Sequence, residues 1–451
     1  MILRVSVAAS LLILASVSSA STDPLLFWPQ WRGPLGTGVA PHADPPIEWS
    51  ETKNLRWKTA IPGMGHSTPA IWGDLVFLTT AEAFGDKVKP VLSDAPGAHD
   101  LTPVTRKHRF IVMAVNRKDG SIAWQLTVLE ETPHEAVHRT ASLASASPST
   151  EGKHVYAYFG SRGLYCLDFK GEVLWQKDFG KMRPMHAHGE GSSPLLHEDV
   201  LILNRDHEGQ SSLHVLDRLT GEERWKVDRG EESSWTTPLV IEVEGKKQII
   251  ISGSYRVRSY DFDSGEEIWN CGGLSKENVV ATPVYGRGLL YVGSTYDHNQ
   301  LLSIRPEGAA GDISGTEHVA WTVRRSAPYV PSFLLYGDAL YFVSHFQGIL
   351  SRVDARTGEG RPGQFRLDGI RQVFASPLGA GKRVYVADRS GATIVLSATD
   401  KPETLAVNRL NDRFSASPIS VDQELYLRGE RHLYCLSESA TESEVAPASI
   451  R

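Results

Sequence analysis

The sequence predicts an all-β protein, a closed eight-bladed β-propeller of four-stranded antiparallel blades. Three observations predict this fold. A nine-residue phrase with Asp, Gly and Trp recurs at 217–225 and 261–269. A motif of two small residues and Pro recurs along the whole chain. A strand-like phrase near the N-terminus supplies the element that the last repeat lacks. A repeat of roughly 45 residues with several short strands is typical of propeller blades.

The recurring phrase combines a tight turn with a Trp on the next strand. Related forms are "NRKDGSIAW" (116–124), "DFKGEVLW" (168–175) and "DARTGE" (354–359). The Asp side chain can accept hydrogen bonds from backbone amides further along the turn, and Gly takes the position that needs a positive φ. We expect the Trp side chains on outer strands to pack on the neighbouring blade while each indole N–H finds an acceptor. These docking residues are Trp57, Trp124, Trp175, Trp225, Trp269 and Trp321.

The small-small-Pro motif marks the start of each repeat. It occurs as "STP", "ASP", "SSP", "TTP", "ATP", "ASP" and "ASP", ending at 69, 148, 194, 238, 283, 377 and 418. In "PSFLLYGDALYF" (331–342), Phe333 takes the place of Pro, which gives an eighth copy. Alternating runs such as "LVFLTT" and "LLYVGS" follow, and β-branched and aromatic residues at period two indicate strands. The first copy carries an insertion at about 82–108.

Closure of the ring follows from the two ends of the repeat region. The eighth copy ends at "LYCLS" (433–437) without a Trp strand, and "NLRWKTAIP" (54–62) precedes the first copy. This N-terminal strand is predicted to complete blade eight, whereas an open solenoid would need a cap at each end. The propeller is therefore expected to span 54–437.

The termini have other roles. Residues 1–20 combine Arg4, an apolar run and the small residues 18–20, which is typical of a secretory signal peptide. We expect an exported protein in the periplasm or outside a bacterial cell, with an N-terminal extension at 21–53 and a flexible tail at 438–451. No other stretch reads as a transmembrane segment.

Composition limits the class of partner. The formal net charge is −6 with Lys and Arg scattered along the chain, which argues against nucleic acid. Three Cys are too few for a disulfide scaffold of this size, and we expect them to be buried small residues. We expect a monomer.

The loops that enter the inner strands and those between second and third strands should share one face, at the mouth of the channel. They carry many Arg and His residues, which suit anionic groups because guanidinium forks match carboxylate and phosphate. The expected partner is a small anionic ligand, a carbohydrate or a protein or peptide. An alternative is that these groups are solvated or pair with local acids. The candidate ligand-binding residues are Arg139, Arg162, His188, Glu190, Arg205, Asp206, Trp235, Arg256, Asp388, Arg389 and Arg413.

The phrase "MHAHGE" (185–190) suggests a metal site. On an extended segment His186, His188 and Glu190 would share a face, and His66 or His138 from neighbouring blades could join them. Such a set suits zinc or another transition metal.

The docking phrase resembles the tryptophan-docking motif of pyrroloquinoline quinone (PQQ)-type β-propeller repeats. The resemblance covers about residues 54–437 and fades where Phe365 and Val407 stand near the expected Trp positions. It implies eight blades, as in quinoprotein alcohol and glucose dehydrogenases and in the non-catalytic propeller lipoprotein of the outer-membrane protein assembly machine. The stretches 28–38 and 188–211 are similar to exported PQQ-like proteins of planctomycete type.

The resemblance leaves two functions open. Alcohol-type quinoproteins place two adjacent Cys over the quinone, a Trp beneath it, and calcium held by Glu, Asn and Asp. This chain has no adjacent Cys pair, although Trp235 could serve as the floor and Glu277, Asn278 and Asp297 as oxygen ligands. The sequence favours a ligand- or protein-binding scaffold. The alternative is a PQQ-dependent or metal-assisted oxidoreductase acting on alcohols or sugars.

Overall fold

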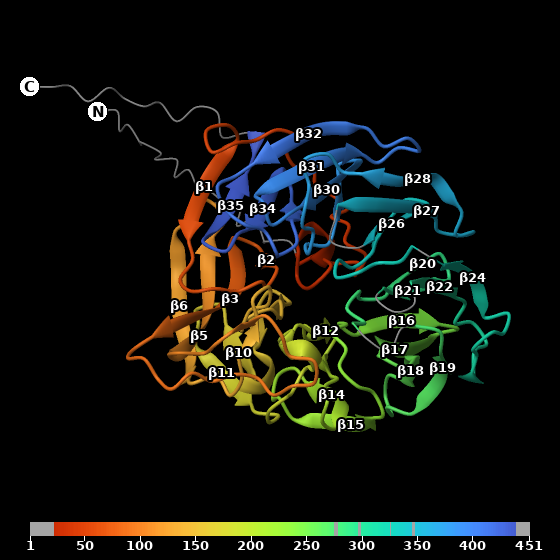
Figure 1. The fold of residues 1–451 in the computed structure, drawn as a ribbon, viewed down its shortest axis with the longest axis horizontal. Coiled ribbons are helices and arrows are strands. Elements are labelled where there is room, and N and C mark those ends of the chain that lie inside the picture. Colours follow the sequence, from red (N-terminus) through yellow and green to blue (C-terminus); the bar gives the residue numbers. More distant parts are fainter. Residues whose placement is uncertain (1–21, 275–277, 296–298, 325, 345–347, 439–451) are drawn as a thin grey trace, which may run out of the picture.

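The computed structural model describes residues 22–274, 278–295, 299–324, 326–344 and 348–438. The predicted signal peptide lies outside them, as does the tail beyond residue 438. Eight sheets stand around a common axis, as Figure 1 shows, and the predicted eight-bladed all-β propeller is confirmed. No helix in the described part of the chain is long and apolar enough to cross a membrane.

Each blade is an antiparallel sheet whose first strand lies nearest the axis. The strands of blades one to four are β2 (Ala70–Trp72), β3 (Leu75–Phe84), β5 (Lys107–Asn116) and β6 (Ile122–Glu131); β8 (Ser149–Thr150), β9 (His154–Tyr158), β10 (Leu164–Asp168) and β11 (Val173–Lys177); β12 (Leu195–His197), β13 (Val200–Arg205), β14 (Ser211–Asp217) and β15 (Glu223–Arg229); and β16 (Leu239–Val243), β17 (Lys246–Ser252), β18 (Val257–Asp261) and β19 (Glu267–Cys271).

Blades five to eight follow the same order. Their strands are β20 (Val284–Gly286), β21 (Leu289–Ser294), β22 (Gln300–Ile304) and β24 (Val319–Arg324); β25 (Leu334–Tyr336), β26 (Ala339–Ser344), β27 (Ile349–Asp354) and β28 (Gly360–Arg366); β29 (Leu378–Ala380), β30 (Arg383–Ala387), β31 (Ala392–Ser397) and β32 (Thr404–Arg409); and β33 (Ile419–Val421), β34 (Glu424–Arg428), β35 (His432–Leu436) and β1 (Leu55–Ala60). Outside the blades lie β4 (Leu101–Thr102), β7 (Val137–His138), β23 (Gly311–Asp312), and the short 3₁₀ helices η1 (Pro24–Leu26), η2 (Gly160–Arg162) and η3 (Met185–Ala187).

The ring closes as the sequence predicts. The N-terminal strand β1 pairs with β35 in antiparallel register, so that Trp57 lies opposite Cys435. The last blade therefore contains three strands from the C-terminal end of the repeat region and one from its beginning. Closure removes the open ends of the blade array, which a linear array would have to cap.

A ring of hydroxyl groups encircles the channel. In each small-small-Pro motif the residue before Pro is Ser or Thr, and Ser332 holds this place before Phe333. The backbone N–H of each such residue donates to the hydroxyl of its counterpart in the next blade, at 2.9–3.3 Å, and Ser417 donates back to Thr68. All eight residues are buried: Thr68, Ser147, Ser193, Thr237, Thr282, Ser332, Ser376 and Ser417.

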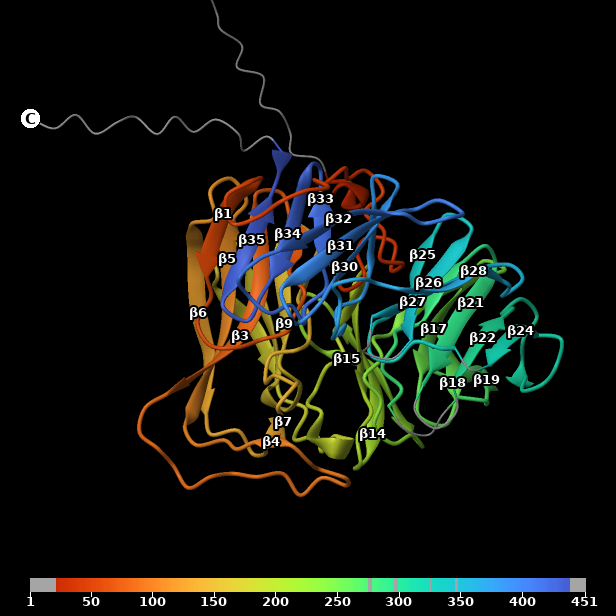
Figure 2. The same cartoon turned by 45° about the horizontal axis from the view of Figure 1, so that its top comes forward.

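The N-terminal extension crosses the channel at the end opposite the insertion (Figures 1 and 2). The Trp31 indole donates to the Thr282 hydroxyl at 3.1 Å. The buried Arg32 guanidinium donates to the carbonyl oxygens of Phe333 and Pro377 at 2.5 and 3.0 Å. The backbone of 28–40 also bonds to blades one, two, six and seven, through Ile71, Thr150, Leu335 and Gly379. This segment is thus a plug held by many blades.

Five of the six docking tryptophans bond to the following blade. The indole N–H of each donates to a backbone carbonyl beside the Asp–Gly turn, at 2.8–3.3 Å; the donors are Trp57, Trp124, Trp175, Trp225 and Trp321. The turn Gly lies under the indole, because a Cβ on Gly221 would come within 2.7 Å of Trp175.

Trp269 differs from the other five. Its indole donates to the side chain of Gln248 in its own blade, at 3.1 Å. The long connection between β22 and β24 replaces the short turn of blade five, and its strand β23 pairs in parallel with β19 at Trp269. This fifth strand covers the indole, which is completely buried.

Removing one hydroxyl of the ring should destabilise the protein. In Ser193→Ala the buried N–H of Ser147 loses its acceptor, and we expect the free energy of unfolding to fall by about 1–3 kcal/mol. Ser149→Ala is the matched control, since this buried hydroxyl has no partner among the described residues and its loss should change little. Urea unfolding followed by Trp fluorescence measures both variants, and equal stability of the two would contradict a structural role for the ring.

A side chain placed under a docking Trp should lower the stability of the protein by more than the backbone strain of the substitution alone. Gly221 and Gly245 have similar φ values, +71° and +73°, but a Cβ on Gly245 would meet nothing within 4 Å. Alanine is strained at both positions because φ is positive. The free energy of unfolding of Gly221→Ala should fall by about 1–3 kcal/mol more than that of Gly245→Ala, because its Cβ overpacks against Trp175. Differential scanning calorimetry of the pair gives the difference. A loss no larger than that of Gly245→Ala would show that the indole contact is loose.

Candidate functional site

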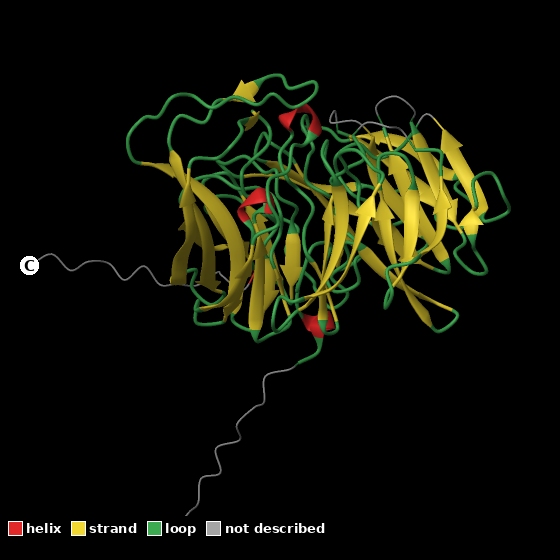
Figure 3. Cartoon of the chain, turned by 90° about the horizontal axis from the view of Figure 1, so that it is seen from below, coloured by secondary structure: helices red, strands yellow, loops and turns green. Residues whose placement is uncertain are grey.

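The insertion of blade one lies over one end of the channel, as Figures 2 and 3 show. The strands β3 and β5 are extended to ten residues each and carry the loop outwards. The loop then returns along the blade connections: β4 pairs with β7, and the amide of His186 donates to Pro96 O at 2.7 Å. The insertion therefore contacts the segments that lead into blades two and three.

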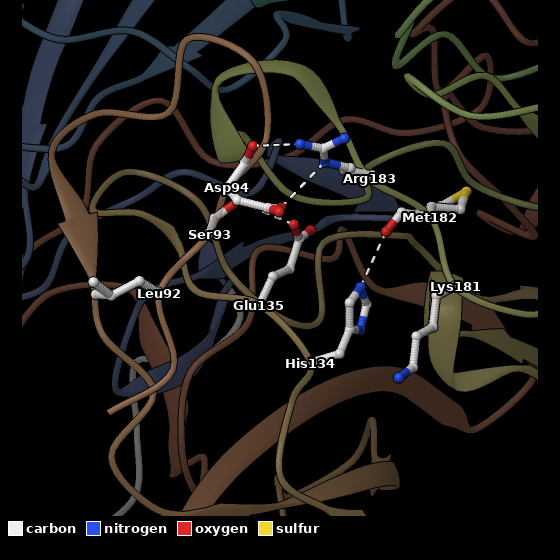
Figure 4. Close-up of a pocket in the computed structure, with 8 residues that line it drawn as sticks. All are labelled: Leu92, Ser93, Asp94, His134, Glu135, Lys181, Met182 and Arg183. Atoms are coloured by element: carbon white, nitrogen blue, oxygen red, sulfur yellow. Dashed lines mark hydrogen bonds and ion pairs between the residues drawn. The ribbon is translucent and has the colours of Figure 1, made fainter. Parts of the chain in front are cut away.

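A cleft of about 440 Å³ opens between the insertion and these connections (Figure 4). Its lining comes from three separate segments: Leu92, Ser93, Asp94, His134, Glu135, Lys181, Met182 and Arg183. Arg183 pairs with the Asp94 carboxylate at 3.2 Å, and one ring nitrogen of His134 bonds Met182 O at 3.0 Å. These contacts hold the insertion and the blade connections around the cleft.

Glu135 is the unusual acid of the cleft. Burial, and then the nearby Glu190 carboxylate, raise the pKa of Glu135 to about 7. The Ser93 hydroxyl donates to it at 3.2 Å. Burial and the Arg162 guanidinium lower the pKa of the neighbouring His134, which disfavours its charged form. The charge of the cleft therefore changes near neutral pH through Glu135.

Four histidines meet beside the cleft. The rings of His99, His138 and His188 have centroids 5.0–5.8 Å apart, and His186 lies 5.2 Å from His188. One nitrogen atom from each of the first three lies within 4.8 Å of the other two. Burial, with the neighbouring histidines, lowers the pKa of His188 to about 3, so its ring is uncharged at neutral pH.

The segment 185–190 is not extended, contrary to the sequence-based expectation. It begins with the 3₁₀ turn η3, in which His186 and Ala187 have φ values of 58° and 53°. The turn separates the three side chains that would have shared a face. Glu190 points instead to η2, where it accepts from the Ser161 amide at 2.7 Å and pairs with Arg162 at 3.1 Å.

Most arginines predicted to bind an anion have partners inside the protein. Arg162 is buried between Glu190 and Glu131, and Arg389 donates to Glu430 at 3.2 Å. Arg205 is buried as well and donates to the Tyr158 hydroxyl at 3.0 Å. These three arginines therefore hold loops together.

The remaining predicted residues differ in burial. Asp206 is buried in a two-pronged pair with Arg229 at 2.8 and 3.1 Å. Asp388 accepts from two backbone amides and a hydroxyl of its own loop and from the backbone amide of Arg371 in another loop. Arg139 and Arg413 are exposed; Arg139 pairs with Asp100 at 3.3 Å, and Arg413 lies 3.7 Å from Glu430. Arg256 is half-buried and pairs with Asp312 at 2.8 Å.

His66 lies apart from the other histidines, in a small cavity of about 70 Å³ between the hydroxyl ring and the plug. Burial, together with Arg389 and Arg428, lowers the pKa of His66 to about 3. A cavity of this size holds one or two water molecules. His66 is thus a neutral side chain of the channel interior.

Among the residues that the structure describes, those expected around PQQ do not fit it. The Trp235 indole donates to Gly189 O at 2.7 Å, and the His188 ring packs beside it with centroids 5.8 Å apart, so Trp235 is not an open floor. Asn278 bonds the side chain of His188, while Glu277 and Asp297 lie outside the described residues. Burial raises the pKa of the isolated thiols of Cys166 and Cys271 to about 12 and 11.

Two features of this face escaped the sequence analysis. His99 comes from the insertion, which has no counterpart in the other repeats, and the only signal was its place in "GAHD" (97–100). Glu135 and Lys181 stand in ordinary polar loops, and their approach depends on how the insertion folds back.

Comparison with known proteins gives a family and a fold. The family model described as outer membrane protein assembly factor BamB matches residues 108–361, more than half of the chain. The crystal structure of BamB from Moraxella catarrhalis matches with a TM-score of 0.53 and 14% identity, over 82% of this chain and 100% of that one. Quinohemoprotein alcohol dehydrogenase from Comamonas testosteroni matches with a TM-score of 0.42 and 10% identity, over 96% and 83%. Curated protein sequences give no match. On the family match and the eight docked blades, the chain belongs to the PQQ-repeat β-propeller family of the outer membrane protein assembly factor BamB.

Proposed function

We propose that the protein is an exported binding module that holds an extended acidic segment of a partner protein in the cleft under the insertion. The family supports a protein partner, because its description is that of an assembly factor. The signal-like residues 1–20 support a place in the periplasm or outside the cell.

The cleft itself carries the proposal. It is open, has about 440 Å³ of space and is bordered by both charged and apolar side chains. Lys181 forms no ion pair within the described part of the chain, and Leu92 at the border is 59% exposed. An extended peptide with alternating acidic and apolar residues would place a carboxylate at Lys181 and an apolar side chain on Leu92.

The charge arrangement favours binding over chemistry. Arg162, Arg389 and Asp206 already have buried partners, so they hold the mouth rigid without needing a ligand. A rigid mouth lowers the conformational cost of association. The alternative of a quinone-dependent oxidoreductase has less support, because His188 packs beside Trp235.

Peptide binding tests the proposal. Fluorescein-labelled eight-residue peptides of alternating acidic and apolar residues are titrated with the full chain, and anisotropy reports the dissociation constant. We expect Lys181→Glu and Leu92→Asp each to weaken binding about tenfold, which is 1.4 kcal/mol. Lys170→Glu, at an exposed outer turn of blade two, is the control and should bind like the unmodified protein.

Two outcomes would contradict the proposal. One is equal binding of peptides in which Lys replaces each acid, or binding that Lys181→Glu leaves unchanged. The other is a large thermal stabilisation by PQQ and calcium together with dye-linked oxidation of an alcohol or sugar.

Binding of the acidic peptide should weaken as pH rises through 7. Glu135 is mostly protonated at pH 6 and mostly ionised at pH 8, because its pKa is raised to about 7. The new negative charge opposes the peptide carboxylates, which are ionised throughout, and we expect a loss of roughly twofold to fivefold. Glu135→Gln should remove this dependence while binding at pH 6 stays unchanged. A steeper loss that persists in Glu135→Gln would assign the effect to another group.

A further inference from the structure

We infer that His99, His138 and His188 form a site for a transition-metal ion of the zinc, cobalt or nickel class, which joins the insertion to the connections into blades two and three. The site is separate from the peptide cleft and does not depend on the proposed function. It also differs from the set expected from the sequence, since His99 replaces His186 and Glu190 is directed elsewhere.

The spacing of the nitrogen atoms fits a metal ion after small side-chain rotations. One nitrogen of each ring lies within 4.8 Å of the other two. In a tetrahedral site with metal–nitrogen bonds of about 2.0–2.1 Å, neighbouring nitrogens are about 3.4 Å apart. The three rings come from three separate segments, so rotation about their side-chain bonds can close the difference without moving a strand.

Each of the three rings is already held by a hydrogen bond. His99 Nδ1 donates to Gly97 O at 2.9 Å, so its Nε2 carries the lone pair. The Thr140 amide donates to His138 Nδ1 at 3.2 Å, so Nε2 carries the proton in this arrangement. Metal binding at Nε2 requires the other tautomer, in which Nδ1 donates to the Thr140 hydroxyl 2.8 Å away. The Asn278 side chain bonds His188. Metal-bound histidines in proteins are oriented in this way by a second hydrogen bond.

The surroundings supply a fourth ligand and a route of entry. Asp100 Oδ2 lies 4.0 Å from His138 Nε2, so either this carboxylate or water can complete four-coordination. His138 is buried, whereas His99 is exposed, and an ion can reach the site from solvent. Three imidazoles with an oxygen ligand suit zinc, nickel and cobalt rather than calcium or magnesium.

His186 has a different role in this arrangement. Its Nδ1 donates to Gly97 O at 3.0 Å, the same carbonyl that His99 uses. A Cβ on Gly97 would come within 2.2 Å of the His186 ring, so glycine permits this close approach. His186 is therefore a positioning residue that holds the loop carrying His99.

A bound ion would cross-link three segments that the chain brings together only in the folded state. The present ties between the insertion and the blades include the short β4–β7 pair, the hydrogen bonds of His186 to Pro96 O and Gly97 O, and exposed ion pairs such as Arg183–Asp94. Exposed pairs of this kind contribute about 0–1 kcal/mol each. A metal that binds only the folded protein stabilises it in proportion to the logarithm of its concentration above Kd.

Metal titration of the full chain tests the inference. After dialysis against a chelator, Zn²⁺ is titrated by calorimetry, and Co²⁺ absorption reports tetrahedral coordination. We expect one ion per chain, a rise in melting temperature, and slower proteolysis within 85–106. His99→Ala and His188→Ala should each weaken binding by at least about 100-fold, the upper end of what loss of an outer hydrogen-bond partner costs.

Matched variants distinguish this site from other histidines. His42→Ala, at an exposed position in the N-terminal extension, should bind as tightly as the unmodified protein. His186→Ala should retain one ion per chain. His99 is exposed, so His99→Ala is expected to fold, and circular dichroism checks this. Binding that survives both His99→Ala and His188→Ala, or that is lost in His186→Ala but not in His99→Ala, would overturn the proposed ligand set.

Discussion

The closed ring of hydroxyl hydrogen bonds around the channel is the constraint on which the other features depend. Each link joins the start of one blade to the start of the next, and the last link returns to Thr68. Because the donors are backbone amides, the links fix the inner strands relative to one another whatever the side chains further out do. The Trp contacts then set the spacing at the outer edge. The loops at the channel mouth can vary in sequence, because the inner and outer strands that carry them are held in place.

The fold was predictable because its determinants are local and repeated. The Asp–Gly turn, the following Trp and the Ser or Thr before Pro recur in the sequence. The Ser or Thr makes the same contact in all eight blades, and the Trp makes the same contact in five. Trp269 was the exception, because its covering strand β23 comes from the connection of the next blade. No sequence pattern around 261–269 predicts this covering strand. The strand β23 takes the place of the usual turn beside Trp269, and it comes from the long β22–β24 connection of blade five.

The candidate site was less predictable, for a related reason. The sequence identified which loops share the mouth but not which charges meet there. Arg162 and Glu190 both looked available to a ligand, and the structure pairs them across two blades. His99 lies in the unrepeated insertion, so no register with the other copies could place it beside His188. Pairings between loops depend on backbone turns such as that at His186, which residue types alone do not determine.

The plug has a consequence for the order in which the molecule can assemble. Residues 28–40 leave the ribosome early, yet their hydrogen-bond partners reach as far along the chain as Phe333, Pro377 and Gly379. The strand β1 likewise cannot pair until β35 has been synthesised. The earliest-made part of the propeller domain therefore completes its contacts only when the last blades are present, and contacts of such long sequence separation form slowly. A chain that folds as it is synthesised must therefore leave β1 and most of the plug without their final partners until the last blades have been made.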